Sequence, residues 1–334
     1  MRTCLRLPAL VFMLFATMVS RASVGFQQMT VPDPQGKPLA VGIWYPGSGT
    51  ASSQPLDLFT QEVVANGQIS GNHLPLILIS HGAGGSFANH YDTALALAGA
   101  GFVVAAVTHT GDNYMDDSYA GNRKDLIDRP RQIKIVTDYM LSVWPQHSHL
   151  DPNRIGIFGF SLGGFTALVE IGGTPDLRRM ILLCSTRPNA PECTFIKQRH
   201  GDQLDPLVNE PVWVHDSRIK AAVVAAPAVG FLFGSGGLQQ VTVPVQLWRA
   251  EKDQQAPDAW NSAIIRQELP RPPQLHVVPG GHFVFSAPCS AALAKVAAFI
   301  CTDPSGFDRA RFHHTFNRTV VTFFQSNLNS KRRP

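Results

Sequence analysis

The chain contains 334 residues, 16% of them charged, and has a formal net charge of +4. A usual length of about 150 residues per domain would allow two domains, but α/β domains often run longer, and no linker or internal repeat divides this chain. The small charge gives no support to nucleic-acid binding. We therefore expect one domain over residues 23–334, with no nucleic-acid partner.

The first 22 residues have the pattern of a signal peptide. Arg2 and Arg6 form a basic start, an apolar run extends from Leu7 to Val19, and Ser20-Arg21-Ala22 offers small residues to a signal peptidase. The run is too short for a stable membrane span. We expect export to the periplasm or the medium, with an N-terminal anchor helix as the alternative. Loss of the segment lowers the formal charge to +1, because it removes three arginines.

Apolar runs and turn residues predict strands that alternate with helices. Strands are expected at 24–31, 38–45, 74–80, 102–107, 154–158, 221–225, 243–247 and 274–278. Helices are expected at 89–100, 130–144, 164–171, 290–300 and 309–328, and a polar loop between the second and third strands. This alternation is typical of an α/β fold with a mostly parallel sheet and helices on both faces. Active sites of such sheets lie beyond the carboxyl ends of the strands.

Gly159-Phe160-Ser161-Leu162-Gly163 is a G-x-S-x-G nucleophile elbow between a predicted strand and a predicted helix. The sharp turn of such an elbow strains the serine backbone, and flanking glycines let strand and helix approach closely. The serine oxygen is then held at a helix N-terminus, where amides favour developing negative charge. The motif predicts Ser161 as a catalytic nucleophile.

An acid and a base follow the elbow in the chain. Asp253 comes after the strand at 243–247, and His282 comes after the strand at 274–278. A serine hydroxyl is a poor nucleophile, so His282 would accept its proton, while the Asp253 carboxylate would fix the imidazole tautomer. The order Ser, Asp, His is that of the α/β hydrolases. Glu251 and Asp258 are the competing acids, and Asp258 could instead cap a helix beginning near residue 259.

An oxyanion hole is expected after the strand at 74–80. His81-Gly82-Ala83-Gly84-Gly85 is similar to the glycine-rich motif whose backbone amide binds a tetrahedral oxyanion. We assign the two donors to the amides of Ala83 and Leu162. A simple glycine-rich turn is the alternative. No phosphate-binding pattern accompanies the segment, and His81 is expected to support the loop rather than to act in catalysis.

Four cysteines remain once the signal segment is removed. An even number in an exported chain indicates disulfides. Of the three possible pairings we favour Cys184–Cys193 with Cys289–Cys301, and the second requires the helix at 290–300 to be short or kinked, because a straight helix would hold its ends too far apart. No clustered ligands indicate a metal site.

These motifs resemble a secreted α/β-hydrolase group called dienelactone hydrolase-like, and especially the bacterial relatives of platelet-activating-factor acetylhydrolase. The matching segments are Ile43–Pro46, His81–Gly85, Gly111–Tyr114, Gly159–Gly164, Gly306–Arg309 and Phe312-His313. Two features depart from the group. Dienelactone hydrolases use a cysteine where Ser161 stands, and the mammalian acetylhydrolase carries its acid after an earlier strand. The position of Asp253 instead resembles the acid of bacterial cutinases and polyester hydrolases, so the resemblance transfers no substrate.

Specificity is expected in segments outside the predicted sheet and its covering helices. About 45 residues, from Thr174 to Lys220, separate the elbow helix from the next strand, far more than a usual connection. We interpret this insertion (residues 174–220) as a lid, with a structural insertion as the alternative. Phe231, Phe233 and Tyr114 are candidates for substrate contacts, with ordinary packing as the alternative, and Asp112 is expected to hold its loop.

The sequence thus predicts a serine carboxylic ester hydrolase that needs no cofactor and acts on small-molecule or lipid esters through an acyl-serine intermediate. A lipase, phospholipase or polyester hydrolase of the same fold is the nearest alternative. An amidase or peptidase would use the same triad, but no peptide-binding groove or propeller domain is indicated. A catalytically silent binding module is the alternative from another class. The oligomeric state is not predicted.

Overall fold

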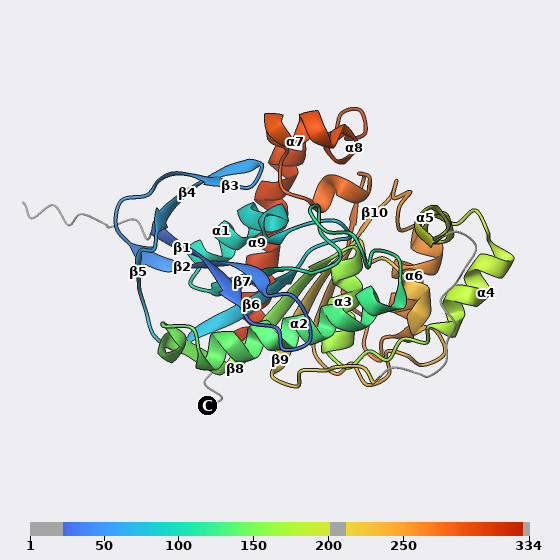
Figure 1. Cartoon of the computed structure of the whole chain (residues 1–334), viewed down its shortest axis with the longest axis horizontal. Coiled ribbons are helices and arrows are strands. Elements are labelled where there is room, and N and C mark those ends of the chain that lie inside the picture. The colour runs from blue at the N-terminus through green and yellow to red at the C-terminus, as the bar shows by residue number, and fades with distance from the viewer. Residues whose placement is uncertain (1–22, 201–211, 330–334) are drawn as a thin grey trace, which may run out of the picture.

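The computed structural model describes residues 23–200 and 212–329, so the predicted signal peptide lies outside the described residues (Figure 1). Within these ranges one sheet has the strand order β11-β10-β9-β8-β6-β7-β2-β1-β4-β3, with β5 paired to β2. The strands are β1 (Ser23–Val31), β2 (Leu39–Ser48), β3 (Ser52–Leu56), β4 (Phe59–Ala65), β5 (Gln68–Ile69), β6 (Leu74–Ser80), β7 (Val103–Thr108), β8 (Leu150–Phe160), β9 (Ile219–Ala225), β10 (Val245–Ala250) and β11 (Gln274–Val278). The run from β11 to β7 is parallel, and β2 pairs antiparallel with β7 and β1. The predicted α/β fold with a mostly parallel sheet is confirmed.

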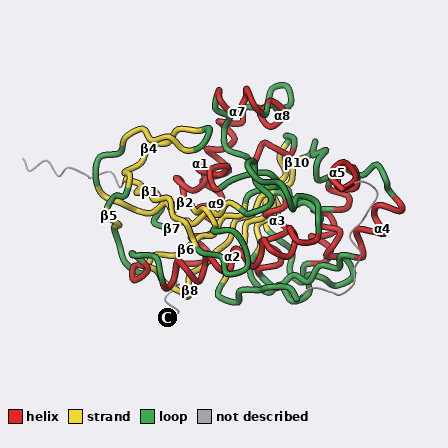
Figure 2. The backbone as a smooth tube through the Cα atoms, in the orientation of Figure 1, coloured by secondary structure: helices red, strands yellow, loops and turns green. Residues whose placement is uncertain are grey.

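Helices enclose the sheet on both faces, as Figure 2 shows. The α-helices are α1 (Tyr91–Gly99), α2 (Arg123–Ser142), α3 (Leu162–Glu170), α4 (Arg178–Thr186), α5 (Pro191–His200), α6 (Ser262–Glu268), α7 (Ala291–Val296), α8 (Ala298–Cys301) and α9 (Arg309–Leu328). Side chains of α2 and α3 pack in one buried cluster, whereas those of α1 and α9 pack in the other. Leu76 and Leu78 of β6 face the first cluster and Ile77 and Ile79 the second, because successive strand residues point to opposite faces. Strand β6 is therefore buried along its whole length and apolar up to Ser80.

The segment between β2 and β6 differs from the predicted polar loop. It contains β3, β4 and β5, of which β3 and β4 form an antiparallel hairpin. Phe59, Gln61 and Val63 alternate inward along β4, and the intervening side chains are exposed. Trp44 donates from Nε1 to Oε1 of Gln61 at 2.7 Å. The prediction was wrong here because about half of the residues in these strands are polar. A strand buried on one face only therefore has a composition similar to that of a loop.

Helix α2 begins at Arg123, seven residues before the predicted start at Pro130. The Asn122 side chain accepts the amide of Asp125 at 3.1 Å and so caps the helix. Pro130 lies inside the helix and is buried. The predicted start was wrong because proline is common at the first position of a helix. Here Pro130 lies inside the helix, where it removes one backbone donor, and the helix begins earlier because Asn122 caps it.

The predicted helix at 290–300 is broken at Ala297 into α7 and α8. The break brings Cys289 and Cys301 within 5.7 Å between Cα atoms, and they form a disulfide. A second disulfide joins Cys184 of α4 to Cys193 of α5, with Cα atoms 5.5 Å apart. Both favoured pairings are confirmed.

Candidate active site

The nucleophile elbow lies at the carboxyl end of β8, where the chain turns directly into α3. Ser161 has φ 55° and ψ −119°, a conformation that side-chain-bearing residues rarely adopt. A Cβ on Gly159 would lie 2.0 Å from the carbonyl oxygen of Gly163, and one on Gly163 would lie 2.0 Å from that of Ser80. Both positions therefore require glycine, and the elbow can close only with this sequence pattern.

A chain of hydrogen bonds joins the three predicted catalytic side chains. Ser161 Oγ lies 2.9 Å from His282 Nε2, and His282 Nδ1 lies 2.7 Å from Asp253 Oδ2. All three side chains are buried or nearly so. The ring of Phe160 packs against His282 with centroids 5.0 Å apart, which limits rotation of the imidazole. The arrangement can carry a proton from the hydroxyl to the imidazole and stabilise the imidazolium.

Asp253 is held by its own loop. Its Oδ1 accepts the amides of Gln255 at 3.0 Å and Ala256 at 2.7 Å, which leaves Oδ2 for His282. The competing acids lie elsewhere: Glu251 is exposed, and Asp258 pairs with Arg266 at 3.0 Å. Asp258 does not cap α6, which begins at Ser262. The geometry therefore brings Asp253, and neither competitor, to the imidazole.

Ala83 and Leu162, the predicted oxyanion donors, lie beside Ser161. Both residues line the cavity that contains Ser161 and His282, and in the described part of the chain neither amide donates a hydrogen bond to the protein. Leu162 is the first residue of α3, where amides have no partner within the helix. These two N–H groups are thus available to a developing oxyanion.

Arg129, which the sequence did not predict, fixes the predicted oxyanion loop (His81–Gly85) through its carbonyl groups. Its side chain is 1% exposed and donates to the carbonyl oxygens of His81 at 2.8 Å and Gly82 at 3.4 Å. In a trans peptide the C=O and N–H point in opposite directions, so anchoring Gly82 O directs the Ala83 N–H away from Arg129. Asp125 lies four residues before Arg129 on α2 and accepts from its Nε at 3.0 Å; this spacing indicates an ion pair in the sequence but not that the pair is buried.

Two carboxyl groups share the Arg129 charge. Asp112 accepts from Arg129 at 2.6 Å and from the Gly84 amide at 2.8 Å, so it holds its loop as expected. Burial is the largest single influence and opposes its ionisation, but the charge of Arg129 and the hydrogen bonds from Arg129 and the Gly84 amide together keep the pKa of Asp112 below its usual value. Burial raises the pKa of Asp125 well above its usual value. The Arg129 guanidinium thus contacts an Asp112 whose ionised form is favoured and an Asp125 whose ionised form is disfavoured by burial.

His81 supports the same loop as a neutral ring. Its Nε2 accepts the amide of His109 at 3.0 Å, so the ring proton is on Nδ1, which donates to Gly82 O at 2.6 Å. Burial lowers the pKa of His81 to about 3 and that of His109 well below its usual value. Both rings therefore stay neutral at ordinary pH, and the expected supporting role of His81 agrees with its contacts.

A cavity of about 460 Å³ opens above Ser161. Its walls come from the oxyanion loop, from the segment at 117–126, from α5 in the insertion, and from α8. Phe195 and Ile196 of α5 and Phe299 and Ile300 of α8 supply much of the apolar surface. Each of these two helices carries a disulfide cysteine, Cys193 and Cys301, so both walls are covalently braced.

The three candidate substrate contacts do not line this cavity. Phe231 and Phe233 lie in the 3₁₀ turn Gly230–Phe233 and pack in the core beside α3, and Phe233 is 5.4 Å from Phe165 between ring centroids. Tyr114 is 58% exposed and lies outside the lining. The prediction placed all three near the pocket because they follow strands, but the turn after β9 folds back onto the helix layer.

The described residues 23–200 and 212–329 contain no cluster of histidine, cysteine or acidic side chains that could hold a metal ion. None of the helices in those ranges is long and apolar enough to cross a membrane.

Known proteins are similar to this chain in part of its sequence and in its fold. Residues 52–137 match the family model for platelet-activating factor acetylhydrolase, isoform II. No curated protein sequence matches the chain. A ferulic acid esterase from Streptomyces cinnamoneus superposes with a TM-score of 0.63 at 18% identity, covering 96% of this chain and 95% of that one. The family match includes the oxyanion loop and Arg129 but not the triad, and it confirms the resemblance that the motifs indicated.

Proposed function

We propose that this chain, which has the α/β-hydrolase fold, is a serine ester hydrolase that acts through an acyl intermediate on Ser161. His282 serves as base and acid, and Asp253 orients its imidazole. The observation that carries the proposal is the continuous hydrogen-bond chain from Ser161 Oγ through His282 to Asp253. It ends at a cavity lined by Ala83 and Leu162, whose backbone amides donate no hydrogen bond within residues 23–200 and 212–329.

Acylation begins when Ser161 Oγ attacks the ester carbonyl carbon and its proton passes to His282 Nε2. The carbonyl oxygen becomes an oxyanion that the amides of Ala83 and Leu162 bind. The tetrahedral intermediate then collapses, the bond to the alcohol oxygen breaks, and His282 gives its proton to that oxygen. The products of this half-reaction are the free alcohol and acyl-Ser161.

Deacylation repeats the sequence with water. His282 takes a proton from the attacking water, the second oxyanion forms at the same amides, and the bond to Ser161 Oγ breaks as His282 returns the proton to it. The acid leaves and the hydroxyl is restored. No step requires a cofactor.

We assign short- to medium-chain acyl esters as substrates, because the cavity of about 460 Å³ has the size of a small-molecule site. The partial match to an acetylhydrolase family supports short acyl groups. Lipase, phospholipase or polyester activity on the same triad is the alternative. The insertion acts as a lid in this proposal, since its helix α5 forms one wall of the cavity.

Export is also part of the proposal. It is supported by the basic and apolar pattern of residues 1–22 and by two disulfides, which persist in oxidising compartments.

The test is hydrolysis of p-nitrophenyl esters from acetyl to palmitoyl by the chain from Ser23 onward, beside Ser161→Ala. We expect hydrolysis that falls with acyl length and vanishes in the variant. Equal activity of the variant would refute the assigned nucleophile. A folded wild type that cleaves no ester would instead favour the binding-module alternative.

A further inference from the structure

An aromatic surface lies next to the proposed catalytic base. The ring of Phe283 packs edge-on against His282, with centroids 5.2 Å apart, and Phe299 packs edge-on against Phe283 at 5.5 Å. Both phenylalanines line the cavity. We call Phe283 and Phe299 the aromatic shelf; it extends from the buried His282 to the solvent-exposed Phe299.

The side chain of Phe299 is largely exposed to solvent. Its side chain is 65% exposed although it is a large apolar group, and such exposure gains the fold little. Val296, three residues earlier at the end of α7, is 70% exposed but does not line the cavity. Phe299 is therefore the exposed apolar side chain of this segment that a cavity ligand can cover.

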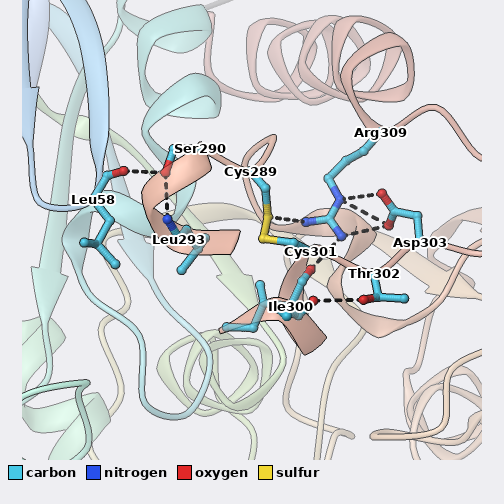
Figure 3. Close-up of a disulfide and its surroundings, with 10 residues drawn as sticks. Leu58, Cys289, Ser290, Leu293, Ile300, Cys301, Thr302, Asp303 and Arg309 are labelled. Carbon is cyan, nitrogen blue, oxygen red and sulfur yellow. Dashed lines mark hydrogen bonds and ion pairs between the residues drawn. A yellow bond between two sulfur atoms is a disulfide. The ribbon is translucent and has the colours of Figure 1, made fainter. Parts of the chain in front are cut away.

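The helix that carries Phe299 is firmly fixed. Figure 3 shows Arg309 beside the Cys289–Cys301 disulfide, where it donates to the carbonyl oxygen of Ile300 at 2.7 Å and to Asp303 at 2.7 Å. Ser290 Oγ accepts the amide of Leu293 and so caps the start of α7. A short exposed helix would ordinarily be mobile, so these ties hold Phe299 ready for contact at little entropic cost.

The chemistry of the proposed reaction decides which part of the substrate meets this surface. His282 Nε2 must donate its proton to the leaving alcohol oxygen, so that oxygen comes within hydrogen-bond distance of the imidazole. The group attached to it then lies on the His282 side of the cavity, where Phe283 contacts the ring.

We propose that the aromatic shelf is the alcohol subsite and selects esters of apolar, preferably aromatic, alcohols. The inference rests on the proposed function and adds the alcohol part of the substrate to it. Phe299 and Phe283 would cover an aryl or branched alkyl alcohol during acylation and have no role in holding the acyl group afterwards.

Partitioning of the acyl-enzyme isolates this subsite. With p-nitrophenyl acetate as donor, benzyl alcohol or methanol competes with water for acetyl-Ser161, and each attack reverses acylation through the alcohol site. Gas chromatography gives the yields of benzyl acetate and methyl acetate against acetate. We expect the wild type to favour benzyl alcohol per mole, and Phe299→Ala to lower the benzyl-to-methyl ratio about tenfold. Val296→Ala, the matched control, should keep the wild-type ratio.

The outcomes are distinct. A wild type without benzyl preference, or a Phe299→Ala variant that retains it, overturns the alcohol subsite while ester hydrolysis stands. A changed dependence on acyl length with an unchanged benzyl-to-methyl ratio assigns the shelf to the acyl side and also overturns it. Absence of any acetyl-enzyme in the folded wild type refutes the proposed function and the subsite together. Thermal melting checks that both variants fold. We expect both to have melting temperatures close to that of the wild type, because each replaced side chain is mostly exposed.

Discussion

Replacing Asp253 with asparagine should leave the fold intact and place the imidazole proton on the wrong nitrogen. Oδ1 of Asp253 accepts two backbone amides, from Gln255 and Ala256. Asparagine keeps these bonds only if its carbonyl oxygen occupies the Oδ1 position, which turns its NH₂ group toward His282 Nδ1. Nδ1 must then accept, so the ring proton moves to Nε2, the atom that faces Ser161 at 2.9 Å. A protonated Nε2 cannot take the serine proton.

Loss of the correct tautomer lowers kcat by about 10⁴-fold in triads of this kind, which corresponds to about 5.5 kcal/mol of transition-state stabilisation. The assay is the steady-state rate with p-nitrophenyl acetate for Asp253→Asn, with Asp258→Asn as the matched control. Asp258 follows the same strand but pairs with Arg266, so its variant should retain wild-type kcat. A folded Asp253→Asn variant within about tenfold of the wild-type kcat would refute the reasoning.

Three further predictions concern Arg129, a glycine of the nucleophile elbow and a buried acid of α3. Arg129→Lys keeps a positive charge but loses the planar guanidinium that binds two carbonyl groups of the oxyanion loop. We expect kcat to fall about tenfold to a hundredfold with little change in KM. A change in KM alone would contradict this role. Gly163→Ala should lower the free energy of unfolding, measured in urea, by about 3 kcal/mol because the added Cβ would clash with the backbone of Ser80. Gly99→Ala is the control: its Cβ would contact nothing within 4 Å, so the variant should be as stable as the wild type or more stable. Glu170, the last residue of α3, is buried, and burial raises the pKa of its carboxyl group well above the usual 4.5. Between the usual pKa and the raised one only the unfolded chain releases this proton, so stability declines as pH rises through that range. Glu170→Gln should show a shallower decline, and parallel curves of stability against pH would contradict the assignment.

The central part of the fold followed from local sequence. Parallel strands buried on both faces are continuous apolar runs, as at β6 and β7, and helix α9 spans the predicted residues 309–328 because its apolar side chains recur at helical spacing. The nucleophile elbow could also be predicted from local sequence, because Gly159 and Gly163 stand where the backbone approaches so closely that only glycine fits. Residues that follow parallel strands were then brought together by the topology, which is how Asp253 and His282 reach Ser161.

The rest depended on contacts that sequence order does not reveal. Arg129 acts on carbonyl groups 47 and 48 residues away in the chain, and a charged residue in a helix usually indicates a solvated face. The break at Ala297 that turns Phe299 toward the cavity was anticipated only through the disulfide it permits. Phe231 and Phe233 were assigned to the pocket from their place after β9, but the direction of the following turn decides which layer such rings enter, and these rings enter the core.

Covalent labelling tests the assigned nucleophile most directly. The folded chain is treated with a fluorophosphonate, which reacts with an activated serine and leaves a stable adduct on its oxygen. The account predicts one adduct per chain, mapped by peptide mass spectrometry to Ser161, with loss of ester hydrolysis in proportion to labelling and no adduct on Ser161→Ala. Labelling at another residue, or hydrolysis that survives complete labelling of Ser161, would contradict it.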